Sequence, residues 1–363
     1  MRIDMSTFSS ETDRAVRTHP SFDDHEHVSI YRDPKTGVEA IVAIHDTTLG
    51  PALGGCRMWS YPSRHEALDD VLRLSRGMTY KNALAGLPHG GGKAVIVADP
   101  RTDKSEALFE AFGDHVETLG GRYITAEDVG ISDADMEIVA RRTGHVRGIR
   151  ATGLGDPSPY TAWGVFCGIR AAVRHRFRRA SLEGLTVAVQ GLGHVGGRLA
   201  ALLHADGARL IVADIDTDRV AEVAARCGAD VAPVDRIHAA DADLFAPCAL
   251  GGGLNAATIP EIRAKVVCGA ANNQLRTPGD AAALVARDIL YAPDYLVNAG
   301  GVISIAPERP GMTADEMKER IARIDSTLSF VLKRADAEGV SPAVIADRVA
   351  EERIFEAARR KSA

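Results

Sequence analysis

The stretch Leu185-Thr186-Val187-Ala188-Val189-Gln190, followed at once by Gly191-Leu192-Gly193-His194-Val195-Gly196, decides the fold of the second half of this chain. The apolar run predicts a buried strand, and the glycine-rich turn leads into a helix predicted over residues 195–206. The three glycines permit a tight turn, a close approach of backbone N–H groups to a pyrophosphate, and close packing of helix on sheet. The stretch therefore predicts a dinucleotide-binding unit, with the pyrophosphate at the positive end of the helix.

The segments that follow alternate between strand and helix, as in a parallel doubly wound sheet. Strands are predicted over 209–213, 244–246 and 265–268, and a helix over 220–227. The second strand ends at Asp214, whose carboxylate can accept the ribose hydroxyl protons. Asp214 and Asp216 would repel a 2′-phosphate, which favours NAD over NADP, and Arg219 is the one nearby residue that could soften this preference. A Rossmann-like domain that binds another nucleotide, or none, is the alternative.

The first half of the chain is predicted to form a separate α/β region. Strands are expected over 38–45 and 93–98, and helices over 63–74, with Ser63 as N-cap and Glu66 completing a capping box, and over 105–119. A cluster of glycines and prolines predicts a hinge between about 144 and 159, at Gly144, Gly148, Gly153, Gly155, Pro157 and Pro159. Beyond it, helices are expected over 161–175, 316–337 and 341–360.

The bulk composition excludes several classes of protein. A chain of 363 residues suits two domains, and a hydrophobic content of 45% is enough for two cores. The net charge of −6 gives no reason to expect a nucleic-acid partner. Five scattered cysteines without a CxxC pair predict reduced thiols, and neither a disulfide framework nor a metal site. With no signal-peptide h-region and no apolar run long enough to span a bilayer, a cytoplasmic protein without a membrane partner is expected.

Two lysines twelve residues apart lie in closely specified settings. Lys81 stands in Gly77-Met78-Thr79-Tyr80-Lys81-Asn82-Ala83, and Lys93 closes Gly90-Gly91-Gly92-Lys93 ahead of an apolar run. One lysine beside glycines is usually a solvated surface residue, but the pair predicts a local cationic site. We expect the Lys93 stem to start at the edge of a strand, where its amine could act as a general base, while a charged Lys81 suits a carboxylate anchor.

A carboxylate partner for the lysines is offered by the run 123–130, which ends a short β-like segment with Glu127 and Asp128. Asp128 could face the same site as Lys93. The alternative is that both acids cap the helix predicted over 132–140. The residues alone therefore predict an amino- or keto-acid oxidoreductase.

These motifs, together with further segments, resemble those of the amino-acid dehydrogenases that include the glutamate, leucine, phenylalanine and valine enzymes. The further segments are 50–58, 125–130, 246–252, 268–275 and 291–302. They run in order, at the family's spacing, from about residue 25 to about 355. The resemblance implies an α/β fold of two domains, an N-terminal substrate-binding and oligomerisation domain and a C-terminal Rossmann-type NAD-binding domain, separated by a cleft.

The resemblance also implies boundaries, a reaction and self-association. Residues 1–150 would form the substrate-binding and catalytic-lysine domain, 151–330 the dinucleotide-binding domain, and 331–363 a C-terminal helix that packs back toward the first domain. The reaction would be the reversible NAD-dependent oxidative deamination of an L-amino acid to a 2-keto acid, ammonia and NADH. Relatives form symmetric assemblies, so a homo-oligomer is expected.

Carried onto this chain, the family's roles fall on named residues. Lys81 would bind the substrate carboxylate, Lys93 would activate the water that attacks the imine, and Asp128 would carry protons to and from the substrate nitrogen. Asn272 would touch both substrate and nicotinamide. The cofactor-binding residues would be Gly191, Leu192, Gly193, His194, Val195, Gly196, Gly197, Asp214, Ile215, Thr161, Cys248, Ala249, Ala270, Ala271 and Asn272. Cys248 is expected to act through its backbone and not as a nucleophile.

The substrate side-chain pocket, by the same correspondence, consists of Leu53, Gly54, Met78, Ala126, Val302 and Ile305. Glutamate-specific relatives have a lysine in place of Leu53 and a serine in place of Ile305, so a glutamate would bury an unpaired charge here. Ala126 with Val302 resembles the leucine and valine type. A branched-chain substrate is expected, without a ranking among leucine, isoleucine and valine. The alternatives are an aromatic (phenylalanine) amino-acid dehydrogenase and, more remotely, a nucleotide-binding protein without catalysis.

Overall fold

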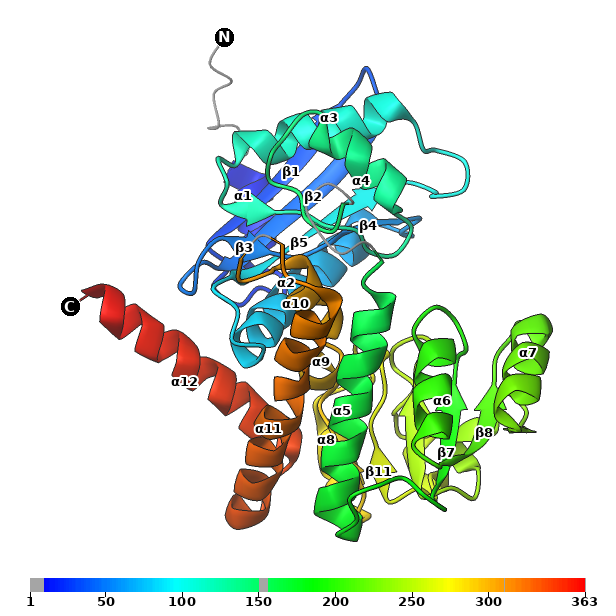
Figure 1. Ribbon diagram of the computed structural model, residues 1–363. Coiled ribbons are helices and arrows are strands. Elements are labelled where there is room, and N and C mark those ends of the chain that lie inside the picture. The colour runs from blue at the N-terminus through cyan, green and yellow to red at the C-terminus, as the bar shows by residue number, and fades with distance from the viewer. Residues whose placement is uncertain (1–9, 150–155, 310, 363) are drawn as a thin grey trace. The chain divides into compact units, whose positions relative to one another are not determined.

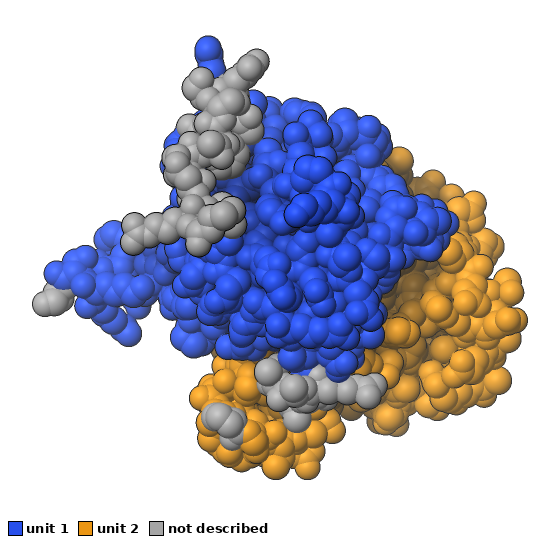
Figure 2. Space-filling view, turned by 90° about the horizontal axis from the view of Figure 1, so that it is seen from above, with its two compact units in different colours: residues 1–153, 354–363 blue, residues 154–353 orange. Residues whose placement is uncertain are grey.

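The computed structural model describes residues 10–149, 156–309 and 311–362, which belong to two compact units (Figure 1). The first unit comprises residues 1–153 with 354–363, and the second comprises residues 154–353 (Figure 2). Of the predicted hinge, Gly153 and Gly155 lie outside the described residues. Within the described ranges, no helix combines the length and the apolar character needed to cross a membrane.

The first unit is built on a six-stranded mixed sheet. Its path runs β1-β2-β5-β3-β6, and β4 pairs with β5 off that path. The strands are β1 (His27–Asp33), β2 (Val38–Asp46), β3 (Ala52–Leu53), β4 (Cys56–Trp59), β5 (Gly90–Val97) and β6 (Tyr123–Ile124). β2 is antiparallel to both β1 and β5, whereas β3 and β4 run parallel to β5. The predicted strand over 38–45 is confirmed, while β1, β3 and β4 were not predicted.

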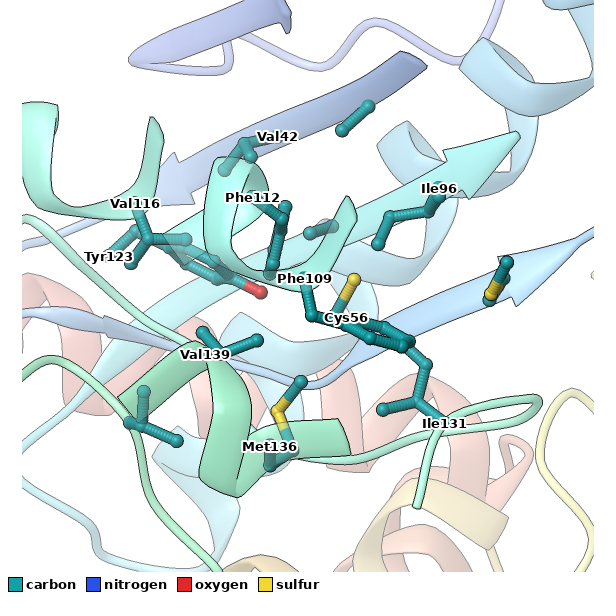
Figure 3. Close-up of a cluster of buried hydrophobic side chains, with 14 of the residues drawn as sticks. Val42, Cys56, Ile96, Phe109, Phe112, Val116, Tyr123, Ile131, Met136 and Val139 are labelled. Carbon is teal, nitrogen blue, oxygen red and sulfur yellow. The ribbon is translucent and has the colours of Figure 1, made fainter. Parts of the chain in front are cut away.

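Helices pack on both faces of this sheet, because successive side chains of β2 point to opposite sides. These helices are α1 (Ser10–Arg17), α2 (Arg64–Leu84), α3 (Glu106–Thr118) and α4 (Asp133–Ala140). Ile41 packs on one face with Val71 of α2. Val42 packs on the other face in a cluster that contains Phe112 of α3 and Met136 of α4 (Figure 3). The predicted helix over 105–119 is confirmed, and its N-cap is Ser105.

Helix α2 lies very close to β5, because that strand opens with three glycines. A methyl group on Gly91 would overlap the backbone nitrogen and the hydroxyl of Thr79 in α2. Asn82 of the same helix donates from Nδ2 to the carbonyl of Gly90 at 2.6 Å and to that of Leu53 at 3.1 Å. These contacts carry the helix to Leu84, ten residues beyond its predicted end, with Ser63 as N-cap.

The expected position of Lys93 at a strand edge was wrong. The glycines before it belong to β5, which begins at Gly90, so Lys93 stands inside the strand and not at its start. The strand was predicted to begin only at Lys93 because glycine disfavours strands, but the missing side chains of the three glycines are what allow α2 to approach.

The second unit is doubly wound, as predicted. Its sheet runs β12-β11-β10-β7-β8-β9, and its described strand pairs are all parallel. The strands are β7 (Thr186–Gln190), β8 (Arg209–Ala213), β9 (Asp230–Val231), β10 (Leu244–Pro247), β11 (Val266–Val267) and β12 (Leu290–Tyr291). Helices α6 (Gly196–Ala205) and α7 (Thr217–Cys227) follow β7 and β8. The alternation of strand and helix predicted from residue 185 onward is confirmed.

The remaining helices complete the second unit. They are α5 (Ser158–Phe177), α8 (Gly279–Ala286), α9 (Asp294–Val297), α10 (Gly300–Ile305), α11 (Ala314–Glu338) and α12 (Pro342–Ser362). α11 lies along α5 (Figure 1), where the indole Nε1 of Trp163 donates to the carbonyl of Lys318 at 3.0 Å. α11 continues through residues 330 and 331, where the boundary between the dinucleotide-binding domain and the C-terminal helix was predicted. α12 begins in the second unit, and its residues from 354 onward belong to the first.

We expect Gly91→Ala to lower the free energy of unfolding by about 3 kcal/mol, because the added methyl group overlaps the backbone of Thr79. Gly77→Ala is the matched control. Gly77 lies inside α2 with no atom within 4 Å of an added Cβ, and alanine favours a helix interior over glycine by about 1 kcal/mol. Denaturant unfolding of both variants measures the difference, and equal stabilities would contradict this account of the packing.

Candidate active site

The first unit contains an ion pair that is largely withdrawn from solvent. The Nζ atom of Lys93 lies 2.7 Å from Oδ2 of Asp128. Lys93 projects from β5 and is only 6% exposed. Asp128 belongs to the segment that follows β6. The structure thus brings together the lysine and the acid for which the sequence predicted a shared site.

Asp128 reaches Lys93 and does not cap the next helix. The N-cap of α4 is Ser132, which forms a reciprocal capping box with Asp135. The alternative in which Glu127 and Asp128 cap this helix is therefore wrong. Gly55 leaves the room that Asp128 occupies, because a Cβ on Gly55 would lie 2.9 Å from the Cβ of Asp128.

Two cations surround the Asp128 carboxylate. Besides Lys93, the Nε atom of Arg57 in β4 lies 3.2 Å from the same Oδ2. Burial by itself would raise the pKa of Asp128, but Lys93 first and Arg57 next outweigh burial and hold that pKa well below its usual value. Asp128 is therefore an ionised carboxylate at neutral pH.

The predicted substrate residues of the first unit lie on neighbouring elements. Leu53 is in β3, which pairs with both β5 and β6, and Ala126 follows β6. Both side chains are buried. Met78 of α2 lies beside Gly54, since a Cβ on that glycine would stand 3.2 Å from Cγ of Met78. Lys81 follows Met78 by three residues and so lies on the same side of α2.

The glycine loop of the second unit joins β7 to α6, as predicted. Gly191 has a φ of +91°, which glycine adopts without strain. A methyl group on Gly196 would overlap the carbonyl oxygen of Gly191. Gly193 differs from both, because the nearest atom to an added Cβ there is Nη1 of Arg219 at 3.7 Å. Gly191 and Gly196 therefore serve the packing of the protein itself, while Gly193 leaves open space into which a ligand can fit.

Asp214 stands at the carboxyl end of β8. Its Oδ1 accepts from the backbone N–H of Asp216 at 2.9 Å, and its Oδ2 accepts from the backbone N–H of Leu192. Each carboxylate oxygen has a second lone pair that can accept from a ribose hydroxyl. Ile215, the next residue, is 88% exposed. The open space at Gly193 and the acceptors of Asp214 fit a dinucleotide.

Other predicted cofactor residues lie at the same edge of the sheet, where the parallel strands end. Cys248 and Ala249 follow β10, and the backbone N–H of Cys248 donates to the carbonyl of Gln190 at 2.7 Å, beside the glycine loop. Ala270 and Ala271 follow β11 on the neighbouring strand. The carboxyl edge is where such folds bind ligands. Burial raises the pKa of Cys248 to about 12, so its thiol stays protonated at neutral pH and is a poor nucleophile.

Asn272 has a buried neighbour that the sequence did not reveal. Nδ2 of Asn298, at the end of α9, donates to Oδ1 of Asn272 at 2.8 Å and to the carbonyl of Ala270 at 3.1 Å. This contact orients the Asn272 amide. Thr161 of α5 lies against α10, the helix that carries Val302 and Ile305, because a Cβ on Gly301 would lie 2.6 Å from the Thr161 hydroxyl.

Arg57, like Asn298, was given no functional role in the sequence analysis. It interrupts the apolar run of β4, between the fully buried Cys56 and Met58. A charged residue in the middle of a buried strand was the available signal, because such a charge needs a partner.

A doubly wound unit of the dinucleotide-binding type and another unit with a buried lysine–aspartate pair are the parts expected of a two-domain dehydrogenase. Comparison with protein families gives two matches in this chain. The model of the Glu/Leu/Phe/Val dehydrogenase dimerisation domain matches residues 25–145, and that of Glutamate/Leucine/Phenylalanine/Valine dehydrogenase matches residues 212–361. The chain belongs to the Glu/Leu/Phe/Val dehydrogenase family, as the sequence resemblance predicted.

Individual relatives agree with this assignment. The leucine dehydrogenase of Geobacillus stearothermophilus is 50% identical over 333 residues, which are 91% of each chain. The valine dehydrogenase of Streptomyces albus is 48% identical over 342 residues, 93% of this chain and 94% of its own. The crystal structure of L-tryptophan dehydrogenase from Nostoc punctiforme matches with a TM-score of 0.81 at 42% identity, covering 96% of this chain and 99% of that one.

We expect Gly193→Ala to weaken NADH binding at least about tenfold while leaving the melting temperature unchanged, because its methyl group enters space that the protein itself leaves open. Fluorescence titration with NADH measures the affinity. Gly279→Ala, at the start of α8 in the same unit, is the matched control and should leave both values unchanged. Wild-type affinity in Gly193→Ala would show that this space is not where the dinucleotide binds.

Proposed function

We propose that this protein catalyses the reversible NAD-dependent oxidative deamination of a branched-chain L-amino acid to its 2-keto acid, ammonia and NADH. The buried Lys93–Asp128 pair carries the proposal, because it supplies an amine and a carboxylate 2.7 Å apart for proton transfer. Identities of 50% and 48% to a leucine and a valine dehydrogenase support the substrate class. NAD is the cofactor of the family's leucine dehydrogenases, and Asp214 suits its free ribose hydroxyls.

Bound NAD supplies the hydride acceptor in this reaction. Lys81, as a cation, binds the substrate carboxylate and so orients Cα for the transfer. Lys93, as an amine, takes a proton from the water that adds to the imine carbon. Asp128 carries protons to and from the substrate nitrogen, so that ammonia can leave. Asn272, oriented by Asn298, contacts the substrate and the nicotinamide.

The apolar residues of the predicted pocket support a branched aliphatic side chain. Leu53 and Ala126 are buried in the first unit, and the pocket residues predicted in the second unit, Val302 and Ile305, are apolar as well. A glutamate side chain would leave its carboxylate unpaired next to Leu53, at a cost of several kcal/mol. The 42% identity to a tryptophan dehydrogenase keeps an aromatic substrate as the second candidate.

The substrate panel tests this proposal directly. We expect NADH formation at alkaline pH to be fastest with L-leucine, L-valine or L-isoleucine, and at least about 100-fold slower in kcat/KM with L-glutamate, because of the unpaired charge. L-Phenylalanine and L-tryptophan complete the panel, and NADP is compared with NAD. A preference for either aromatic substrate would replace the branched-chain assignment, and no turnover of any substrate would leave a nucleotide-binding protein without catalysis.

The two lysines should differ in their kinetic effects. We expect Lys93→Ala to lower kcat by about 100-fold or more, because the proton acceptor is lost. Lys81→Ala should instead raise the KM of the amino acid strongly, because it removes the carboxylate anchor. Steady-state rates with saturating NAD separate the two effects. Full activity in Lys93→Ala would exclude the mechanism, and an unchanged KM in Lys81→Ala would exclude the anchor.

A homo-oligomer is proposed as well, since residues 25–145 match a dimerisation domain. Light scattering after size exclusion should give a mass that is a whole multiple, at least twofold, of 38.6 kDa. A mass equal to one chain at micromolar concentration would refute this. The number of subunits and the cytoplasmic location stay predictions.

A further inference from the structure

Arg57 is the centre of a chain of charged contacts that leads away from Lys93 and Asp128. Its Nε lies 3.2 Å from Oδ2 of Asp128, and its Nη1 lies 2.8 Å from Oδ2 of Asp70 in α2. The hydroxyl of Tyr61, in the loop between β4 and α2, donates to the same Asp70 oxygen at 2.6 Å. The guanidinium thus joins two carboxylates on two different elements, and the second carboxylate is itself held by a hydrogen bond.

The geometry suits arginine in particular. A guanidinium is a rigid planar fork that can donate in two directions at once, whereas an ammonium is a single point of charge on a flexible stem. The Arg57 side chain is 18% exposed, as is that of Asp128, so water screens this contact only weakly.

We propose that Arg57 is a positioning residue for the dehydrogenase reaction: anchored by Asp70 and Tyr61, it fixes the orientation of the Asp128 carboxylate toward Lys93 and supplies a permanent positive charge beside it. The inference rests on the proposed function of the Lys93–Asp128 pair, because a positioning role has meaning only if that pair handles protons.

The permanent charge matters because the charge on Lys93 has to change during the reaction. When Lys93 is the neutral amine that activates water, it no longer compensates the buried Asp128 carboxylate. Arg57 cannot lose its proton in a protein, so it compensates Asp128 in both states of Lys93. Without Arg57, a protonated Lys93 would be the main stabilising charge beside Asp128, and the pair would release its proton with more difficulty.

The charges around the Lys93–Asp128 pair determine whether the loss of Arg57 moves proton release by the pair to higher or to lower pH. Among the described residues, the titratable and charged groups that interact with Asp128 or stand directly behind Arg57 include Lys93 of β5, Arg57 and Cys56 of β4, Tyr123 of β6, Asp70 of α2 and Tyr61. Burial raises the pKa values of Cys56, Tyr61 and Tyr123, so these three stay neutral at pH 7. Removing the Arg57 cation therefore moves proton release by the pair to higher pH, whereas removing the negative charge of Asp70 moves it the other way.

The experiment compares Arg57→Gln, Arg57→Lys and Asp70→Asn with wild type in the full-length enzyme. For Arg57→Gln we expect kcat of deamination to fall about 100-fold with less than about a threefold change in the KM of the amino acid, because only the proton-handling groups are misplaced. The ascending limb of kcat/KM against pH should move up by about one pH unit. In Arg57→Lys the ascending limb should lie close to its wild-type pH, because the positive charge is kept. Its kcat should stay nearly as low as in Arg57→Gln, because lysine lacks the planar guanidinium. Asp70→Asn should lower kcat less and move the limb slightly to lower pH.

A second readout does not depend on activity. The carboxyl carbon of Asp128 is followed by NMR in protein labelled with ¹³C-aspartate and identified by its absence in Asp128→Asn. In Arg57→Gln it should titrate at higher pH than in wild type. Arg142→Gln is the matched control, because it breaks a surface ion pair with Asp114 in the same unit and should change none of these values. The melting temperature and the circular dichroism spectrum report whether each variant is folded.

The outcomes separate the two proposals. If wild type deaminates amino acids and Arg57→Gln keeps its kcat, its pH profile and the Asp128 titration, the positioning role is refuted while the function stands. The positioning role is also refuted if kcat falls but neither the ascending limb of kcat/KM nor the Asp128 titration moves, because Arg57 would then be a purely structural residue. If wild type deaminates nothing but the Asp128 titration still moves, the proposed function fails and the link from Arg57 to Asp128 remains. Should Arg57→Gln not fold, the other two variants decide. A low kcat with a near-wild-type limb in Arg57→Lys, together with a limb moved to lower pH in Asp70→Asn, supports the positioning role, and wild-type behaviour of both variants refutes it.

Discussion

The close contact between helix α2 and the glycine strand β5 is the constraint on which the first unit depends. Thr79 lies where any side chain on Gly91 would have to be, and Asn82 ties the helix to the carbonyls of Gly90 and Leu53. At this separation the side of α2 that carries Met78 and Lys81 stands next to the strand that carries Lys93. A larger residue in β5 would push the helix outward and carry the lysine on it away from its place. The glycines before Lys93 therefore have a structural purpose, and the chemistry follows from the position they allow.

The second unit uses the same device for a different purpose. Gly196 brings the start of α6 against the carbonyl of Gly191, which aims the first backbone N–H groups of the helix at the end of β7. Asp214 then links this loop to the next strand through the backbone N–H of Leu192. Because these contacts are internal to the protein, the protein's own atoms position the loop. The carbonyl of Gly193 accepts from the backbone N–H of Gly197, but a side chain on Gly193 would enter open space, which is why the prediction assigns that space to a ligand.

Much of the fold could be predicted from the sequence, and the failures have physical causes. The doubly wound unit was predictable from residue 185 onward, since strand, glycine loop and helix signals agree there. β3 is two residues long, too short to show a period, and the start of β5 was misjudged because glycine disfavours strands. The pairing of Lys93 with Asp128 could be suggested from motifs, but the choice between this pairing and a helix cap needed the Ser132–Asp135 capping box. Arg57, Asp70 and Tyr61 come together only in the folded unit, where β4 pairs with β5 and α2 packs on β5, and no local sequence pattern predicts this.

The buried cluster around Asp128 is best understood through charge balance. One carboxylate with one lysine would be neutral only while the lysine is protonated, and a general base must spend part of each cycle unprotonated. Burial makes that state expensive, because an uncompensated carboxylate strongly disfavours low-dielectric surroundings. With Arg57, the three groups Lys93, Asp128 and Arg57 carry a net positive charge when Lys93 is protonated and no net charge when it is not. Their charges are therefore balanced in the state in which Lys93 activates water. Asp70, on the side of Arg57 away from Asp128, partly offsets the extra positive charge, and its side chain is more exposed than that of Arg57. A site that must lose a proton at Lys93 therefore gains from holding one cation that cannot lose its own.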